Sequence, residues 1–310
     1  MINKVKTIKN ELISQMNMKV KGNIYHWTQI NFAFNSNKIE GSRLSKDQTE
    51  QIFETNNMFI EPKDKELVPL DDALEARNHF RLFDYMLKTV DEPLSKEMMI
   101  QMNMILKRGT SYEDNPYNVG GFKVRVNGIG MINLFKATKP ADVETELDAL
   151  LEKFQNKGVL SFEDIVEFHV CFERIHPFGD GNGRTGRMIM FKQCLQNNCI
   201  PFVLLDRDRA FYLRGLKEWD FERNYLIDTL LTQQDVYASV CEQFDIFKDF
   251  GQKELSKNKI VDENEQYVLF EIDEGIYQLV ADDQVIGETE KSNICDALES
   301  IKSQKVKLDF

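Results

Sequence analysis

Helical periodicity is the feature that most constrains the fold of this chain. Apolar residues recur at helical spacing in ten amphipathic stretches between residues 3 and 248. These stretches are 3–18, 24–40, 46–57, 71–89, 95–107, 141–156, 161–175, 184–197, 207–217 and 221–248. Capping-box spacing marks two helix starts, at Ser45 with Gln48 and at Ser161 with Asp164. The sequence therefore predicts a mainly α fold, and no repeat period indicates a solenoid.

One short segment, between residues 121 and 132, alternates with the period of a strand instead. Its alternating residues are Phe122, Lys123, Val124, Arg125 and Val126. The dipeptide Asn127-Gly128 follows and favours a tight turn, so we predict a β-hairpin. On these residues alone the hairpin is either a structural ornament or a functional flap, and the ornament is the simpler interpretation.

The composition changes after residue 251. Residues 253–259 are polar, and three β-rich runs at 267–272, 275–280 and 284–288 precede a helical pattern over 292–305. We therefore expect three parts in the chain. N-terminal helices occupy residues 1–60, a helical catalytic domain occupies 61–250, and a small βββα appendage occupies 251–310.

Charge and cysteine usage limit the partners and the compartment. The 310 residues include 39 Lys and Arg against 51 Asp and Glu, a net charge of −12. Such an acidic surface repels a nucleic-acid backbone, so binding of nucleic acid by bulk charge is disfavoured. No apolar run reaches the roughly 18 residues of a membrane span, and no signal peptide precedes the first helix. The five cysteines are scattered without a C-x-x-C pair, which indicates reduced thiols in a cytoplasmic protein.

The run HPFGDGNGRTGR, residues 176–187, carries the strongest chemical signal. Pro177 ends the helix predicted over 161–175, because it disfavours helical geometry in the residue before it. Glycines at 179, 181 and 183 let the backbone turn its N–H groups inward, and a new helix begins near Arg184. The free amides and the positive dipole end of that helix then face the same loop. The segment is therefore predicted to be an anion cradle suited to phosphate.

Charged residues surround this cradle. Arg184 and Arg187 add two fixed positive charges, Asp180 offers a hard oxygen ligand for Mg²⁺, and His176 has the ordinary pKa of a general base. Each residue alone has a simpler interpretation: a capped histidine, a turn, or arginines paired on a solvated face. Phe178 is most simply a core anchor. Together and in this order they indicate nucleotide chemistry.

This run resembles the Fic-domain signature H-x-F-x-[DE]-G-N-G-R-x-x-R at every position. The similarity extends to the helix at 73–79, to the hairpin at 121–132 as a target-docking flap, and to the stretch 206–216 with Tyr212. About residues 20–245 are covered. The resemblance implies a Fic-type helical bundle with a β-hairpin flap, followed here by the small β-rich appendage.

The resemblance also implies an activity and residue roles. Fic enzymes transfer AMP from ATP to a Ser, Thr or Tyr hydroxyl of a protein and release pyrophosphate. Carried over, His176 is the general base, Asp180 holds Mg²⁺, and the nucleotide site comprises Gly181, Asn182, Gly183, Arg184, Arg187 and Tyr212. The flap residues 122–126 pair with the main chain of the target. The partners implied are a protein with a hydroxyl side chain, which includes the chain itself, while a homo-oligomer is left open.

A second motif, Ser36-Asn-Lys-Ile-Glu40-Gly41, resembles the inhibitory pattern [ST]-x-x-x-E-[GN] of the family. Ser36 and Glu40 share one helix face, and Gly41 suits a helix C-terminus. By resemblance, Glu40 pairs with Arg187 and leaves ATP in an unproductive pose. The chain is thus identified with the class II members, which carry the inhibitory helix in cis.

Three other functions compete with AMP transfer. Removal of AMP with Glu40 positioning a water is one, and a non-enzymatic Fic-fold interaction module is another. The related Doc kinases carry a lysine at the second glycine of G-N-G, so Gly183 argues against phosphorylation. Outside the motif, the histidines at 26, 79 and 169 and the methionines at 98, 99, 102 and 104 are interpreted as packing residues.

Overall fold

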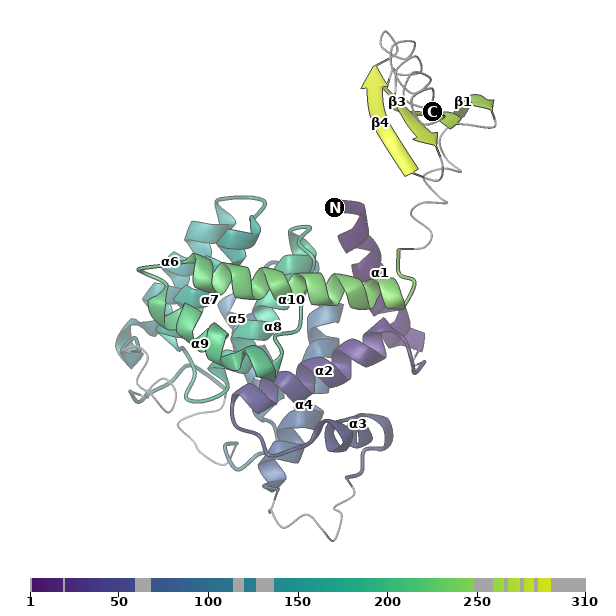
Figure 1. The fold of residues 1–310 in the computed structure, drawn as a ribbon. Helices are drawn as coiled ribbons and strands as arrows, with labels where there is room; N and C mark the ends of the chain where they lie inside the picture. Colours follow the sequence, from purple (N-terminus) through teal and green to yellow (C-terminus); the bar gives the residue numbers. More distant parts are fainter. Residues whose placement is uncertain are drawn as a thin grey trace. The chain divides into compact units, whose positions relative to one another are not determined.

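The computed structural model describes residues 2–18, 20–58, 68–113, 120–126 and 137–247, and the backbone of four strands between residues 259 and 290 (Figure 1). The chain divides into two compact units, Met1–Ile246 and Phe247–Phe310. Within the described residues, no helix is both long enough and apolar enough to cross a membrane.

The first unit is helical, and its described part contains ten α-helices. They are α1 (Ile2–Met18), α2 (Ile24–Ile39), α3 (Lys46–Thr55), α4 (Leu70–Lys88), α5 (Lys96–Lys107), α6 (Val143–Gln155), α7 (Phe162–Ile175), α8 (Asn182–Gln196), α9 (Arg209–Glu218) and α10 (Asn224–Gln243). Two short 3₁₀ turns, Pro140–Asp142 and Asp206–Asp208, precede α6 and α9. Each helix overlaps one stretch predicted from periodicity, so the mainly α class is confirmed.

The predicted capping boxes start α3 and α7. The Ser161 hydroxyl accepts from the Asp164 amide at 3.1 Å, and the Asp164 carboxylate accepts from the Ser161 amide at 3.1 Å. Ser45 and Gln48 exchange the same two bonds at 3.1 and 3.0 Å. These bonds satisfy amides that the first turn of a helix leaves without partners. The start of α7 matters for function because this helix leads directly into the glycine-rich run.

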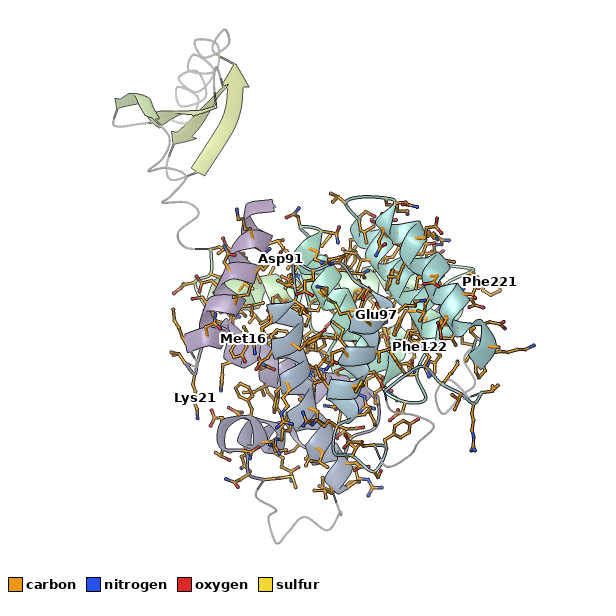
Figure 2. All side chains as sticks on the ribbon, turned by 180° about the vertical axis from the view of Figure 1, so that it is seen from behind. Met16, Lys21, Asp91, Glu97, Phe122 and Phe221 are labelled. Atoms are coloured by element: carbon orange, nitrogen blue, oxygen red, sulfur yellow. The ribbon has the colours of Figure 1, made fainter. Side chains whose placement is uncertain are left out.

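Helix α8 runs through the interior of the first unit, with α2, α4, α5 and α7 packed around it (Figure 1). Its Phe191 ring stacks 5.5 Å from Phe32 of α2 and meets Phe83 of α4 edge-on at 5.4 Å. Side chains fill the space between these helices (Figure 2). Because α8 is buried all round, its N-terminus and the residues before it are held by several helices at once.

The methionines of α5 follow helical spacing. Met98, Met99 and Met102 are buried, as predicted for packing residues. Met104 was wrongly assigned to this group, because it lies on the outer side of the helix and is 38% exposed.

The predicted flap differs from the expected strand. Residues 120–126 form bends without strand assignment, and the Asn127-Gly128 turn lies outside the described residues. Lys123 is buried, whereas Val124 and Val126 are 59% and 69% exposed, which inverts the predicted alternation. The reason is that the Lys123 amide donates to the carbonyl of Pro177 at 2.8 Å, so this segment is fastened to the glycine-rich run. The hairpin as a whole stays a prediction.

The second unit contains an antiparallel sheet in the order β1-β2-β3-β4. Its strands are β1 (Lys259–Asn264), β2 (Tyr267–Asp273), β3 (Ile276–Ala281) and β4 (Gln284–Glu290). Three of them overlap the predicted β-rich runs. The first, KIVDEN, is an edge strand whose polar second half gives no alternating signal, and it was not predicted. The helix expected over 292–305 lies outside the described residues.

Candidate active site

The loop between α7 and α8 is shaped by its own side chains. Helix α7 ends at Ile175, and the capping residue His176 has a left-handed backbone (φ 50°, ψ 60°) and an amide that donates to the Phe172 carbonyl at 2.9 Å. Phe178 is fully buried and its ring lies 5.7 Å from that of Phe122. Phe178 is therefore the core anchor that the sequence suggests.

Asn182 braces the same loop. Its side-chain oxygen accepts from the Phe178 amide at 2.8 Å, and its side-chain nitrogen donates to the Phe178 carbonyl at 2.8 Å. Both polar atoms of the amide are thus used within the loop. Asn182 shapes the cradle from inside, which adds to the role expected from the resemblance.

Helix α8 begins at Asn182, two residues earlier than predicted. Gly181 precedes it with φ 80°, and a Cβ there would lie 3.0 Å from Asn103 Nδ2 of α5. The first helical hydrogen bond of α8 runs from the Thr185 amide to the Gly181 carbonyl at 3.0 Å. The amides of residues 182–184 come before this bond and carry the positive end of the helix dipole. The helix start thus has the backbone geometry expected of the predicted cradle, and its binding of an anion stays a prediction.

Four charged side chains form a cluster beside the cradle. Both Lys107 Nζ and Arg184 contact Oδ2 of Asp180, the latter at 3.5 Å. Glu75 bridges the two cations, with Oε1 on Lys107 and Oε2 on Arg184. Asn103 donates to the Asp180 carbonyl at 2.9 Å. Lys107 and Glu75 were not predicted, because a charged residue on an amphipathic helix has the same sequence signature whether it faces solvent or a site.

Asp180 is ionised by this cluster. Burial by itself would raise the pKa of its carboxyl, but the charges of Arg184 and Lys107 lower that pKa below its ordinary value. The described contacts of the carboxylate engage Oδ2, and the side chain is 42% exposed. Among the described residues, no group of three or more His, Cys, Asp or Glu side chains is placed to hold a metal. Proteins commonly bind Mg²⁺ through one or two carboxylates together with the phosphates of a bound ligand. A single, partly exposed carboxylate such as that of Asp180 fits this kind of site.

Arg187 is held by the end of α2. Its Nη2 donates to Glu40 Oε1 at 2.8 Å and to the Ser36 carbonyl at 2.9 Å, while Nε donates to the Ser36 hydroxyl at 3.1 Å. Gly41 has φ 99° and its amide donates to the Lys38 carbonyl at 3.0 Å, so it ends α2 as predicted. The structure thus brings the two sequence motifs together, although residues 36 and 187 are 151 positions apart.

The Glu40 carboxylate covers the cradle. A Cβ on Gly183 would overlap Oε1 of Glu40, so only glycine admits the carboxylate over the first turn of α8. Burial would raise the pKa of Glu40, but the charges of Arg187 and Arg184 hold it below its ordinary value. Glu40 is therefore a carboxylate at neutral pH.

A buried polar layer supports Arg187 from behind. The Tyr212 hydroxyl lies 2.8 Å from His169 Nε2, and the Tyr212 ring centroid lies 6.0 Å from the Arg187 guanidinium carbon. Tyr212 is 2% exposed, so in this structure it offers a nucleotide little surface and instead supports Arg187. Burial raises the pKa of the neighbouring Glu173 to about 8. His169 and His79 are buried too, in the packing roles predicted for them.

His176 lies at the rim with a neutral ring. Its Nδ1 is 3.3 Å from the Glu173 carbonyl oxygen. Burial, followed by the charge of Lys123, lowers the pKa of His176 to about 4. The imidazole is consequently unprotonated at neutral pH, the state that a general base needs.

Comparisons with known proteins agree with this geometry. The sequence model of the Fic/DOC family matches residues 93–194. A protein adenylyltransferase fic-1 of Caenorhabditis briggsae is 24% identical over 224 residues, which are 70% of this chain and 41% of that protein. A probable protein adenylyltransferase of Aquifex aeolicus is 30% identical over 81 residues, 26% of this chain and 25% of that protein. The chain therefore spans less than half the length of either relative.

The fold is also similar to solved structures. A Fic domain containing signaling protein from Bacteroides thetaiotaomicron superposes with a TM-score of 0.63 at 19% identity, over 80% of this chain and 97% of that chain. A Fic family protein from Desulfovibrio desulfuricans has a TM-score of 0.56 at 18% identity, over 77% and 74% of the two chains. At this identity the comparison establishes the fold.

Proposed function

Residues 93–194 form a domain of the Fic/DOC family, and from this premise we propose that the chain is a protein adenylyltransferase held in check by Glu40. It transfers AMP from ATP to a hydroxyl side chain of a protein. The observation that carries the proposal is the contact of Glu40 and Ser36 with Arg187, next to an intact backbone cradle. The Glu40 carboxylate lies over the first turn of α8, where it competes with an anionic ligand for the same positive charge.

The reaction uses a small number of groups. Neutral His176 accepts the proton of the target hydroxyl, and the oxygen attacks the α-phosphorus of ATP. The bond from that phosphorus to the bridging oxygen breaks, and pyrophosphate leaves. Positioning and charge stabilisation supply most of the rate in such transfers. The amides of residues 182–184 orient the α-phosphate, and Arg184 binds the phosphates beyond it.

Asp180 is the side chain that would hold Mg²⁺, since its carboxylate is ionised and partly exposed. Bound Mg²⁺ would offset the negative charge of the phosphates. Lys107 contacts the Asp180 carboxylate and is itself held by Glu75, so the carboxylate is already oriented before a nucleotide arrives.

Inhibition follows from the partners of Arg187. Its guanidinium is buried, and its Nε and Nη2 donate to Ser36 and to the Glu40 carboxylate, so these donors are not available to a third phosphate. The charge and the position of Glu40 both oppose the γ-phosphate of ATP. ATP can then occupy the cradle only in a pose unsuited to in-line attack.

The test replaces Glu40 and measures self-labelling with fluorescent ATP. We expect Glu40→Gly to label at least about tenfold faster than the parent, which corresponds to the ~1.5 kcal/mol of a charge-assisted hydrogen bond. Glu92→Gly, an exposed loop glutamate, serves as the matched control. Adding His176→Ala to the Glu40 variant should abolish labelling while ATP binding persists. Equal labelling by Glu40→Gly and the parent contradicts the inhibitory role.

Removal of AMP is a second candidate, favoured by the state of Glu40. Its carboxylate is ionised and its side chain is 37% exposed, so it can orient a water toward a phosphodiester in the cradle. Incubating an AMP-modified protein with the parent and with Glu40→Gly separates the two directions. Loss of the adduct with the parent alone assigns hydrolysis to Glu40, whereas persistence with both leaves transfer as the function.

A further inference from the structure

Lys123 occupies an unusual place for a residue of a docking segment. It is 2% exposed, whereas the residues that follow it, 124–126, are exposed. Its Nζ donates to the carbonyl of Ile175 at 3.1 Å, and its backbone amide donates to the carbonyl of Pro177 at 2.8 Å. One residue therefore holds both neighbours of His176.

His176 needs such support because its backbone is strained. A residue with a Cβ in the left-handed region is uncommon and persists where its surroundings enforce it. The hydrogen bond from the His176 amide to the Phe172 carbonyl holds the backbone of His176 against the last turn of α7. Lys123 holds the carbonyls of the residues before and after His176. The ring of Phe122 against Phe178 adds an apolar contact to the same junction.

We propose that Lys123 is a positioning residue for His176, clasping the loop through the carbonyls of Ile175 and Pro177 so that the imidazole keeps its place at the cradle. This inference rests on the proposed function, in which His176 is the general base. It gives Lys123 a role different from that of a strand residue that pairs with a target, which is what the sequence predicts.

The same ammonium acts on the imidazole electrostatically. The groups that shift the pKa of His176 are, in order, its burial and Lys123, which lower it, then the Glu173 carbonyl, Glu40 and Asp180, which raise it. Lys123 is thus the main positive charge acting on the ring. Burial lowers the pKa of Lys123 itself to about 8, so the ammonium is charged at neutral pH. Removing that charge moves the imidazole pKa upward, and because exposing the ring would move it the same way, the variant that keeps the positive charge, Lys123→Arg, separates the two causes.

The experiment titrates the histidine rings by NMR in the full-length protein. The chain has four histidines, so the ring signals are few, and the His176→Gln variant assigns the one of interest. In Lys123→Met we expect the pKa of His176 to rise by about 1 pH unit. Lys123→Arg should keep it near the parent value, and the neutral, polar Lys123→Gln should repeat the rise. The control is Lys139→Met, an exposed lysine that does not act on His176.

Transfer kinetics give a second readout, measured in the Glu40→Gly background. Because a displaced base slows chemistry more than binding, kcat should fall about 10- to 100-fold in Lys123→Met while KM for ATP stays within about twofold. Lys123→Arg should recover most of kcat. An unchanged His176 pKa in both neutral variants, or a kcat that arginine does not restore, overturns the role of Lys123. If Glu40→Gly itself transfers no AMP, the proposed function fails, and the titration still decides whether Lys123 acts on His176.

Discussion

Replacing Glu75 by glutamine tests the charged cluster beside the cradle. The parent carboxylate bridges two buried cations, with one oxygen on Lys107 and the other on Arg184. A glutamine has a single acceptor at that position, so its NH₂ group must face one of the two cations. The change keeps the shape of the side chain and removes one negative charge.

The expected cost follows from burial. The side chains of Lys107, Arg184 and Glu75 are 4%, 5% and 12% exposed. Removing one partner of a buried ion pair costs about 3–5 kcal/mol, because a charge is left without compensation. Asp180 still contacts both cations, which places the expected loss at the lower end, about 3 kcal/mol. For a helical unit of this size that loss lowers the melting temperature by about 6–12 °C.

Differential scanning fluorimetry measures this shift in the full-length protein. The exposed Glu152 on α6 provides the control, since Glu152→Gln makes the same chemical change without a buried cation nearby. Saturating ATP with Mg²⁺ should narrow the gap between Glu75→Gln and the parent, because phosphate oxygens supply negative charge to Arg184. A melting temperature within about 1 °C of the parent in the absence of ATP refutes the reasoning, since it means that the two cations do not depend on Glu75.

Two further predictions concern stability. The pKa of Glu173 is raised from 4.5 to about 8. Between these pH values the folded protein keeps a proton that the unfolded chain has lost. The contribution of Glu173 to the free energy of unfolding therefore falls as the pH rises. Glu173→Gln stays neutral, and urea unfolding should show its stability relative to the parent increasing from about pH 5 to about pH 8; a constant difference would contradict the assignment. Gly215→Ala should destabilise by about 1–3 kcal/mol, because its Cβ would lie 2.7 Å from Leu226 Cα where α9 packs on α10, whereas Gly121→Ala, with nothing within 4 Å, should not. Equal unfolding midpoints for the two alanine variants would contradict the close packing of Gly215 against Leu226.

The interior helices show how far periodicity carries a prediction. All ten stretches fold as helices because an amphipathic stripe must be buried whatever its partner is. The starts of α3 and α7 were also predicted correctly, since a capping box involves only residues three positions apart. The start of α8 was placed two residues late because the left-handed Gly181, packed against α5, sets it, and that contact is not local.

The segment around Lys123 shows where the alternating pattern misled. Phe122, Val124 and Val126 alternate as a half-buried strand would, but the buried side chain is the lysine between them. Lys123 is held by the carbonyls of Ile175 and Pro177, which lie more than 50 residues away in the chain. The sequence around Lys123 therefore gives no indication of these acceptors. A buried lysine is stable only when such acceptors are present, and the sequence does not locate them.

The sequence by itself determined the helices, the glycine cradle and the identity of the two motifs, because each depends on neighbours within a few residues. Only the tertiary structure decided how the charges combine. It placed Glu40 of α2 over Gly183 and against Arg187, Glu75 of α4 between Lys107 and Arg184, and Lys123 beside the base. These contacts join residues far apart in the chain, and their strength comes from burial that several helices create together, which no segment of the sequence carries alone.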